Sequence, residues 1–179
     1  MAEEKKEPWL NLLALTTVIL AVAATLSTFK GGGFSTRSVL RQSQASDQWA
    51  FYQAKSIKGN LYEMEVARLA RDLKALEAEK GSAVRLEEAR KALDEAKAKV
   101  AKYDQEKAEI KAKAETLEKE RDGAMRQGAP FGLAVIFLQI AILLSSIAAL
   151  LKKKPIYFAG LAVGAVGLVY FANGFFLFF

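Results

Sequence analysis

The chain has 179 residues, 52% hydrophobic and 26% charged, with 26 Lys and Arg against 20 Asp and Glu and a formal net charge of +6. It contains no His and no Cys, which excludes imidazole or thiolate metal sites, Ser-His and Cys-His nucleophile pairs, and disulfides. Such high apolar and charged fractions are compatible only if the two kinds of residue are segregated along the chain.

Three runs without a charged residue are each long enough to cross a hydrocarbon core of roughly 30 Å as a helix. They cover residues 9–29, 129–151 and 155–179. The first run follows the mixed-charge start MAEEKKEP and no small-residue cleavage site follows it, so we interpret it as an uncleaved anchor rather than a signal peptide. The sequence therefore predicts an all-α membrane protein with three transmembrane helices, in which residues 1–30 form the N-terminal tail and the first helix.

Residues 46–60 read SDQWAFYQAKSIKGN and gather aromatic side chains beside charged ones. Trp49 and Tyr52 are three positions apart and share a helix face, which fits helix packing or a subunit contact. Trp and Tyr also favour the headgroup layer, so a helix lying in the membrane interface is an alternative. A ligand or catalytic site would need a base, nucleophile pair or metal set, which this segment lacks. We therefore predict oligomer or interfacial contacts at Trp49, Phe51, Tyr52 and Ile57.

The charged segment 31–128 is predicted to be a long antiparallel coiled-coil helical hairpin inserted between the first and second transmembrane helices. Both its ends lie at one membrane surface, so it must reverse direction. Gly81-Ser82 supplies a helix-ending Gly and a helix-capping Ser near its middle, which gives arms at about 35–80 and 83–128. Its 20 Lys and Arg are interleaved with 17 Asp and Glu, which argues against nucleic-acid binding.

The second arm keeps apolar residues at alternating spacings of three and four over about five heptads, the pattern of a coiled coil. These positions, with two charged interruptions, are Leu86, Ala89, Leu93, Ala96, Val100, Tyr103, Lys107, Ile110, Ala114, Leu117, Arg121 and Ala124. The first arm has a matching stripe near the turn, which we expect to shift in phase around Gly59. The stripe near the turn is Tyr62, Val66, Leu69, Leu73 and Leu76, and the shifted stripe is Ala50, Ala54, Ile57, Leu61 and Met64. Because many positions are Ala, the hairpin buries little area alone, which favours packing against copies of itself.

The segment QSQASDQWAFYQAKSIKGNLYE at residues 42–63 follows STFKGGGFSTRSVLRQ and the N-terminal PWLNLLALTTVILAV. This chain resembles, over its whole length, a bacterial membrane family catalogued as domain of unknown function 4337. The segment around Trp49 is the specific part of the resemblance. The resemblance implies a bacterial cytoplasmic-membrane protein, and it carries over no activity and no functional residue.

The predicted transmembrane helices contain no charged side chain, which argues against a transporter or pump. Small residues recur every fourth position instead, which lets helix backbones approach closely within one chain or between subunits. The candidate packing residues are Ala141, Ser145 and Ala149 in the second helix, and Gly160, Gly164 and the nearby Gly167 in the third. Gln139 joins them as a candidate, because it lies mid-helix where facing lipid would be costly.

The short loop between the last two transmembrane helices contains Lys152, Lys153 and Lys154, which, with Lys5 and Lys6, favours the cytoplasm. The hairpin would then lie in the periplasm. Basic residues also flank the hairpin side of the membrane and oppose this orientation, but long insertions obey the charge rule poorly. These opposing residues are Lys30, Arg37, Arg41, Lys119, Arg121 and Arg126.

Taken together, these features predict a non-enzymatic coiled-coil protein anchored as a multi-pass protein in the bacterial cytoplasmic (inner) membrane. We expect a homo-oligomer with a structural or scaffolding role, in contact with membrane lipid and without nucleic acid, cofactor or metal. The alternative is an oligomeric pore, a lipid-enclosing ring or a transport accessory subunit. A membrane enzyme would need convergent titratable residues, which the sequence does not offer.

Overall fold

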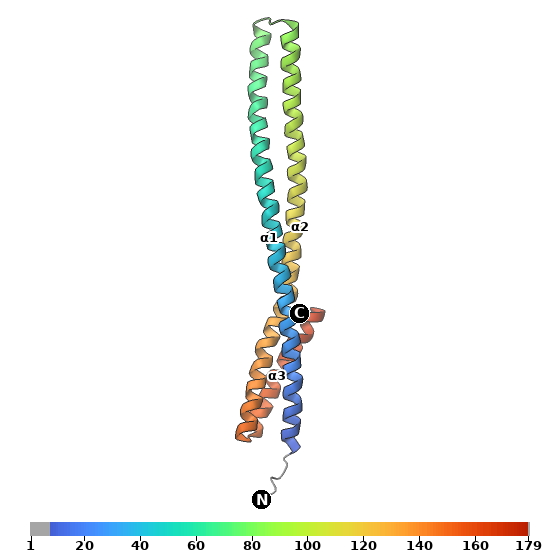
Figure 1. Ribbon diagram of the computed structural model, residues 1–179, viewed down its shortest axis with the longest axis vertical. Helices are drawn as coiled ribbons and strands as arrows, with labels where there is room; N and C mark the ends of the chain where they lie inside the picture. Colours follow the sequence, from blue (N-terminus) through green and yellow to red (C-terminus); the bar gives the residue numbers. More distant parts are fainter. Residues whose placement is uncertain (1–7, 179) are drawn as a thin grey trace, which may run out of the picture. The chain divides into compact units, whose positions relative to one another are not determined.

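The computed structural model describes residues 8–178, so the tail 1–7 with Lys5 and Lys6, and residue 179, lie outside the described residues. The described chain is all-helical, with no strand (Figure 1). Its three helices are α1 (Pro8–Ala78, 71 residues), α2 (Ala83–Leu151, 69 residues) and α3 (Lys154–Phe176, 23 residues). By length and composition, each of the three can cross a membrane.

The chain divides into two compact units, and α1 and α2 contribute to both. The bundle unit comprises Met1–Leu40 and Glu120–Phe179, and the paired-helix unit comprises Arg41–Lys119. Pro8 begins α1, where its missing N–H has no helical partner to lose. No further Pro occurs before Pro130, which leaves the long charged stretches, rich in Ala, Leu, Glu and Lys, free to form uninterrupted helix.

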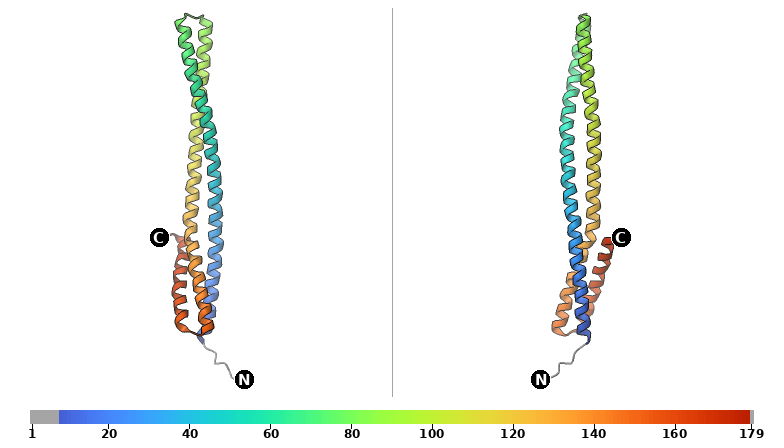
Figure 2. Two further views of the ribbon diagram at one scale, coloured as in Figure 1. Left: turned by 90° about the vertical axis from the view of Figure 1, so that its left-hand side faces the viewer. Right: turned by 45° about the vertical axis from the view of Figure 1, so that its right-hand side comes forward.

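The bundle unit packs segments of α1, α2 and α3 side by side (Figure 2). Small and apolar side chains lie between them. One cluster consists of Leu20, Ala23, Ala24, Ala134, Leu138 and Ala141, and a second of Leu13, Ala148 and Tyr157. Many large apolar side chains point outward instead, including Val18, Leu143 and Phe158, which are 60%, 64% and 64% exposed. The unit therefore keeps mostly small residues inside and presents a largely apolar outer surface.

In the paired-helix unit, α1 and α2 lie side by side and antiparallel (Figure 2). Side-chain contacts that join low-numbered residues of α1 to high-numbered residues of α2 define this direction. From one end to the other, they are Trp49–Glu118, Lys55–Glu106, Tyr62–Tyr103 and Glu77–Arg90. Leu93, Ala96 and Ala114 of α2 are buried against α1.

The reversal between α1 and α2 lies at residues 79–82. Lys80, and not Gly81, adopts the left-handed conformation that ends the helix, with φ at 53°. The backbone N–H of Gly81 donates to the carbonyl of Leu76 at 2.9 Å, and that of Lys80 donates to Glu77 at 3.3 Å, which is the Schellman pattern. The expectation that Gly81 supplies the helix-ending conformation is therefore corrected. Gly81 instead allows a close approach, because a Cβ there would lie 3.2 Å from the Leu76 oxygen.

Candidate functional site

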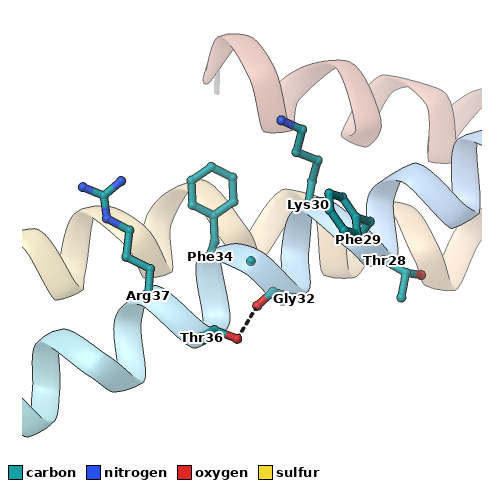
Figure 3. Close-up of a pocket in the computed structure, with 8 residues that line it drawn as sticks. Thr28, Phe29, Lys30, Gly32, Phe34, Thr36 and Arg37 are labelled. Atoms are coloured by element: carbon teal, nitrogen blue, oxygen red, sulfur yellow. Dashed lines mark hydrogen bonds between the residues drawn. The ribbon is translucent and has the colours of Figure 1, made fainter.

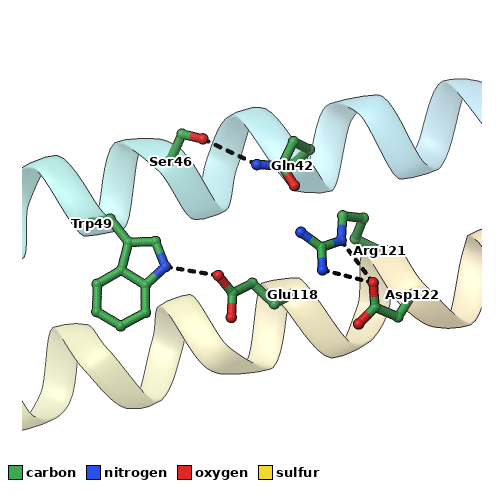
Figure 4. Close-up of polar contacts among 6 residues, drawn as sticks. All are labelled: Gln42, Ser46, Trp49, Glu118, Arg121 and Asp122. Atoms are coloured by element: carbon green, nitrogen blue, oxygen red, sulfur yellow. Dashed lines mark hydrogen bonds and ion pairs between the residues drawn. The ribbon is translucent and has the colours of Figure 1, made fainter.

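The aromatic segment predicted to make contacts lies on α1 in the paired-helix unit, and the structure divides its residues between two sides of the helix. The indole Nε1–H of Trp49 donates to a carboxylate oxygen of Glu118 at 2.9 Å (Figure 4). Tyr52 meets the Trp49 ring edge-on, with ring centroids 5.6 Å apart. Phe51 and Ile57 are 59% and 63% exposed. Trp49 therefore belongs to the contact between α1 and α2, whereas Phe51 and Ile57 do not.

A polar and aromatic cluster occupies the middle of the α1–α2 contact. Lys55 Nζ lies 2.6 Å from a Glu106 oxygen and 5.5 Å from the ring centroid of Tyr103. The hydrogen bond between Lys55 and Glu106 raises the pKa of Lys55 and lowers the pKa of Glu106. Tyr103 stacks on Tyr62 at 5.6 Å, and the buried Gly59 lies beside it, with room for a Cβ 3.7 Å from the Tyr103 Cβ. The cluster therefore joins α1 to α2 through an ion pair and a pair of stacked rings.

The expected phase shift around Gly59 is wrong. Ile57, Leu61 and Met64 are 63%, 57% and 65% exposed, while Gly59 is buried between the helices. Gly59 has no apolar side chain to continue the stripe. Because it has no side chain, it lets α2 approach closely. The side of α1 turned away from α2 therefore carries a second set of apolar residues. We name this set the outer stripe: Ala50, Phe51, Ala54, Ile57, Leu61 and Met64.

The small residues predicted to pack the apolar helices lie mostly inside the bundle unit. A Cβ built on Gly164 would lie 3.3 Å from Ala141, and one on Gly160 would lie 3.4 Å from the Ser145 Oγ. A Cβ on Gly167 would lie 2.8 Å from the Leu138 side chain. These contacts join α2 to α3 within one chain.

The remaining predicted packing residues lie at the edge of this contact or outside it. Ala149 is half-buried beside the cluster that contains Tyr157. The structure does not bring Gln139 into the contact, because its side chain is exposed. The three lysines 152–154 are exposed in and beside the turn between α2 and α3, where Lys152 has φ at 51°.

Two further residues, Phe131 and Asn173, are buried in the bundle unit, and sequence reasoning missed the first of them. Phe131 is 1% exposed and its ring packs edge-on against Phe175, at 5.2 Å. A Cβ on Gly174 would lie 2.6 Å from the Phe131 ring. Asn173 is 2% exposed, and its Oδ1 accepts the backbone N–H of Phe178 at 2.8 Å, beyond the end of α3. Its polarity in an otherwise apolar run marks Asn173 in the sequence as a residue that needs a hydrogen bond.

Among residues 8–178, no group of three or more Asp and Glu side chains could hold a metal ion. The fold and the contacts define an all-α protein with three helices that are able to cross a membrane. Charged parts of two of these helices, α1 and α2, form the paired-helix unit. The chain belongs to the family described as domain of unknown function (DUF4337), whose model matches residues 9–177, so the family resemblance is confirmed. No curated protein and no solved structure matches the chain.

Proposed function

We propose that the protein is a non-enzymatic scaffold of the bacterial cytoplasmic membrane, with the bundle unit embedded in lipid and the paired-helix unit inserted between the first and second transmembrane helices as a coiled-coil hairpin. The distribution of side chains in the bundle unit supports this placement. Most of the residues in its interior are small, while Val18, Leu143 and Phe158 point outward. Large outward apolar side chains are unfavourable in water and cost little in lipid. The charged paired-helix unit, by contrast, requires water around it.

The scaffold acts by self-association, and the observation that carries this is the outer stripe. Apart from Phe51, which lies beside the row, its residues recur at spacings of four and three from Ala50 to Met64, the spacing by which one helix packs against another. Exposed apolar residues in such a row mark an interaction surface. The charged residues Asp47 and Arg68 continue the same spacing at the two ends of the stripe, and so limit its length to about four helical turns.

A second copy of the chain is the occupant that the stripe fits best. Copies that share one membrane and one orientation present their stripes in parallel, so that each apolar residue meets its own counterpart. In that register Lys58 flanks Gln53 of the other copy, and Glu65 flanks Asn60, so no like charges face each other beside the stripe. The contact is short and weak in solution, but confinement to a membrane raises the effective concentration of the partners.

Single cysteines test this association, because the chain has none of its own. Leu61→Cys in the full chain, reconstituted in membranes and oxidised, is expected to form a disulfide-linked dimer. Ala112→Cys, at an exposed position of α2 outside the stripe, is the matched control and should remain monomeric. Equal cross-linking of both variants, or a clean monomer at micromolar concentration in nanodiscs, would contradict the proposal. Ion flux through liposomes containing the Leu61→Cys dimer would favour an oligomeric pore instead.

The orientation that we propose places the loop with Lys152, Lys153 and Lys154 in the cytoplasm and the paired-helix unit in the periplasm. Cysteines at Ser82 and Lys153, probed from outside intact cells with a membrane-impermeant thiol reagent, test it. Labelling at Ser82 alone is expected. Labelling at Lys153 alone would reverse the orientation.

A further inference from the structure

We propose that α1 carries a binding notch for the phosphate headgroup of an anionic phospholipid, centred on Gly32 and Gly33. This inference rests on the membrane placement proposed above. The notch lies directly after the uncharged run 9–29, where a transmembrane helix leaves the hydrocarbon and reaches the level of lipid phosphates.

The notch is a hollow of about 630 Å³ on the surface of α1. It exists because two adjacent residues lack side chains: a Cβ built on Gly32 or Gly33 has nothing within 4 Å. Phe29, Lys30, Phe34 and Arg37 stand around this gap. Lys30, Phe34 and Arg37 extend toward the same side of the helix (Figure 3).

Both cations of the notch are free of carboxylates. No Asp or Glu lines it, and neither Lys30 nor Arg37 forms an ion pair within residues 8–178. The Lys30 ammonium lies 5.9 Å from the ring centroid of Phe175, a contact that still leaves its hydrogen-bond donors available. Arg37 follows two helical turns later and offers the planar fork that binds phosphate through two hydrogen bonds.

The apolar part of the lining favours a lipid over a free anion. Phe29 is 78% exposed and Phe34 is half-buried beside the cations, so aromatic surface and positive charge occur together. A phospholipid uses both, because its phosphate meets the cations and its acyl chains cover the rings. Exposed glycines inside a helix destabilise it. They do, however, allow a ligand to approach the helix backbone closely.

The test uses the full chain in phosphatidylcholine nanodiscs that contain a trace of spin-labelled phosphatidylglycerol or, in parallel, spin-labelled phosphatidylcholine. The motionally restricted fraction of each label measures its relative affinity. We expect the wild-type chain to prefer phosphatidylglycerol. In Lys30→Gln/Arg37→Gln, the relative affinity for phosphatidylglycerol should fall by about five-fold for each cation removed. Lys153→Gln/Lys154→Gln removes the same charge elsewhere and is expected to keep the preference. An equal loss of the preference for phosphatidylglycerol in both double variants would contradict binding at the notch.

Gly33→Leu separates the notch from its charge, because it fills the hollow and retains both cations. It is expected to abolish the preference, whereas Gly123→Leu, at another glycine with nothing within 4 Å, should leave it unchanged. Wild-type preference in Gly33→Leu overturns the inference, as does displacement of the labelled lipid by inorganic phosphate alone, which would indicate a site for free anions. Unchanged helical content by circular dichroism verifies folding of each variant. Failure of the wild-type chain to enter nanodiscs would overturn the membrane placement and this inference together.

Discussion

The indole N–H of Trp49 donates to a carboxylate oxygen of Glu118 at 2.9 Å and thereby joins residues 69 positions apart in the sequence. Tyr52 packs against the indole in an edge-type contact, at 5.6 Å between ring centroids. The Trp49 side chain is therefore held by both a hydrogen bond and a ring contact. Because the acceptor lies on α2, the bond favours one alignment of the two helices over those displaced by a turn.

Loss of this bond is expected to destabilise the helical pair. Trp49→Phe keeps a ring but removes the donor, and should lower the free energy of unfolding by about 1 kcal/mol. Thermal unfolding of the full chain, followed by circular dichroism, measures the effect. A double-mutant cycle with Glu118→Ala separates the bond from ring packing: we expect coupling of about 1 kcal/mol, and strictly additive effects would contradict the assigned bond.

The segregation of apolar and charged residues was enough to predict an all-helical chain with three helices able to cross a membrane. Periodicity also singled out Gly160 and Gly164, because small residues must recur where helix backbones approach closely. Composition and small-residue spacing depend only on residues near one another in the sequence. They predict the structure where local composition decides it.

The alignment of α1 with α2 depends on residues far apart in the sequence. The α1 sequence carries two apolar rows, and periodicity cannot say which one faces α2. The two rows together predict a phase shift around Gly59, yet Gly59 is buried against α2 because it is small. The choice depends on partners such as Glu118 and Tyr103, whose positions opposite α1 follow only from the register of the whole pair.

Gly167, which is buried in α3, should not tolerate a side chain. Gly167→Ala would place a Cβ 2.8 Å from the Leu138 side chain and 3.0 Å from its backbone nitrogen. We expect a loss of about 1–3 kcal/mol in stability. Gly132→Ala meets open space in the same unit and should be neutral or stabilising by up to about 1 kcal/mol. Unfolding temperatures in one detergent compare the two variants, and a similar loss for both would refute the packing of α3 against α2.

Replacement of Lys80 by Gly should stabilise the turn. Lys80 has φ at 53°, a conformation that is costly for a residue with a Cβ and readily adopted by Gly. Lys80→Gly is therefore expected to raise the free energy of unfolding by about 1 kcal/mol. Gly81→Ala is the contrasting variant, because its Cβ would lie 3.2 Å from the Leu76 oxygen, and it should destabilise. Chemical denaturation of the full chain distinguishes these opposite signs, and a loss in Lys80→Gly would contradict the turn geometry.

The ion pair of Lys55 and Glu106 should make the helical pair sensitive to acid. The pKa of Glu106 is lowered from its ordinary value of 4.5, mainly by the hydrogen bond from Lys55, so its contribution is present above pH 4.5 and is lost as the pH falls through the lowered value. The pKa of Lys55 is raised above 10.5, so its contribution persists until the pH rises beyond that value. The stability of the full chain should accordingly decrease below about pH 4.5 and remain level through neutral pH.

Glu106→Gln isolates the contribution of this pair, because Glu65 also has a lowered pKa, through its hydrogen bond with Arg68, and responds in the same pH range. The variant should unfold at a lower temperature than the wild type near neutral pH, and the difference should shrink as the pH falls below 4.5, where the wild-type carboxylate becomes protonated. Glu88→Gln, which removes an exposed carboxylate on the same helix, is the matched control and should follow the wild-type profile. A difference between Glu106→Gln and wild type that stays constant from acid to neutral pH would mean that packing, and not charge, links Glu106 to α1.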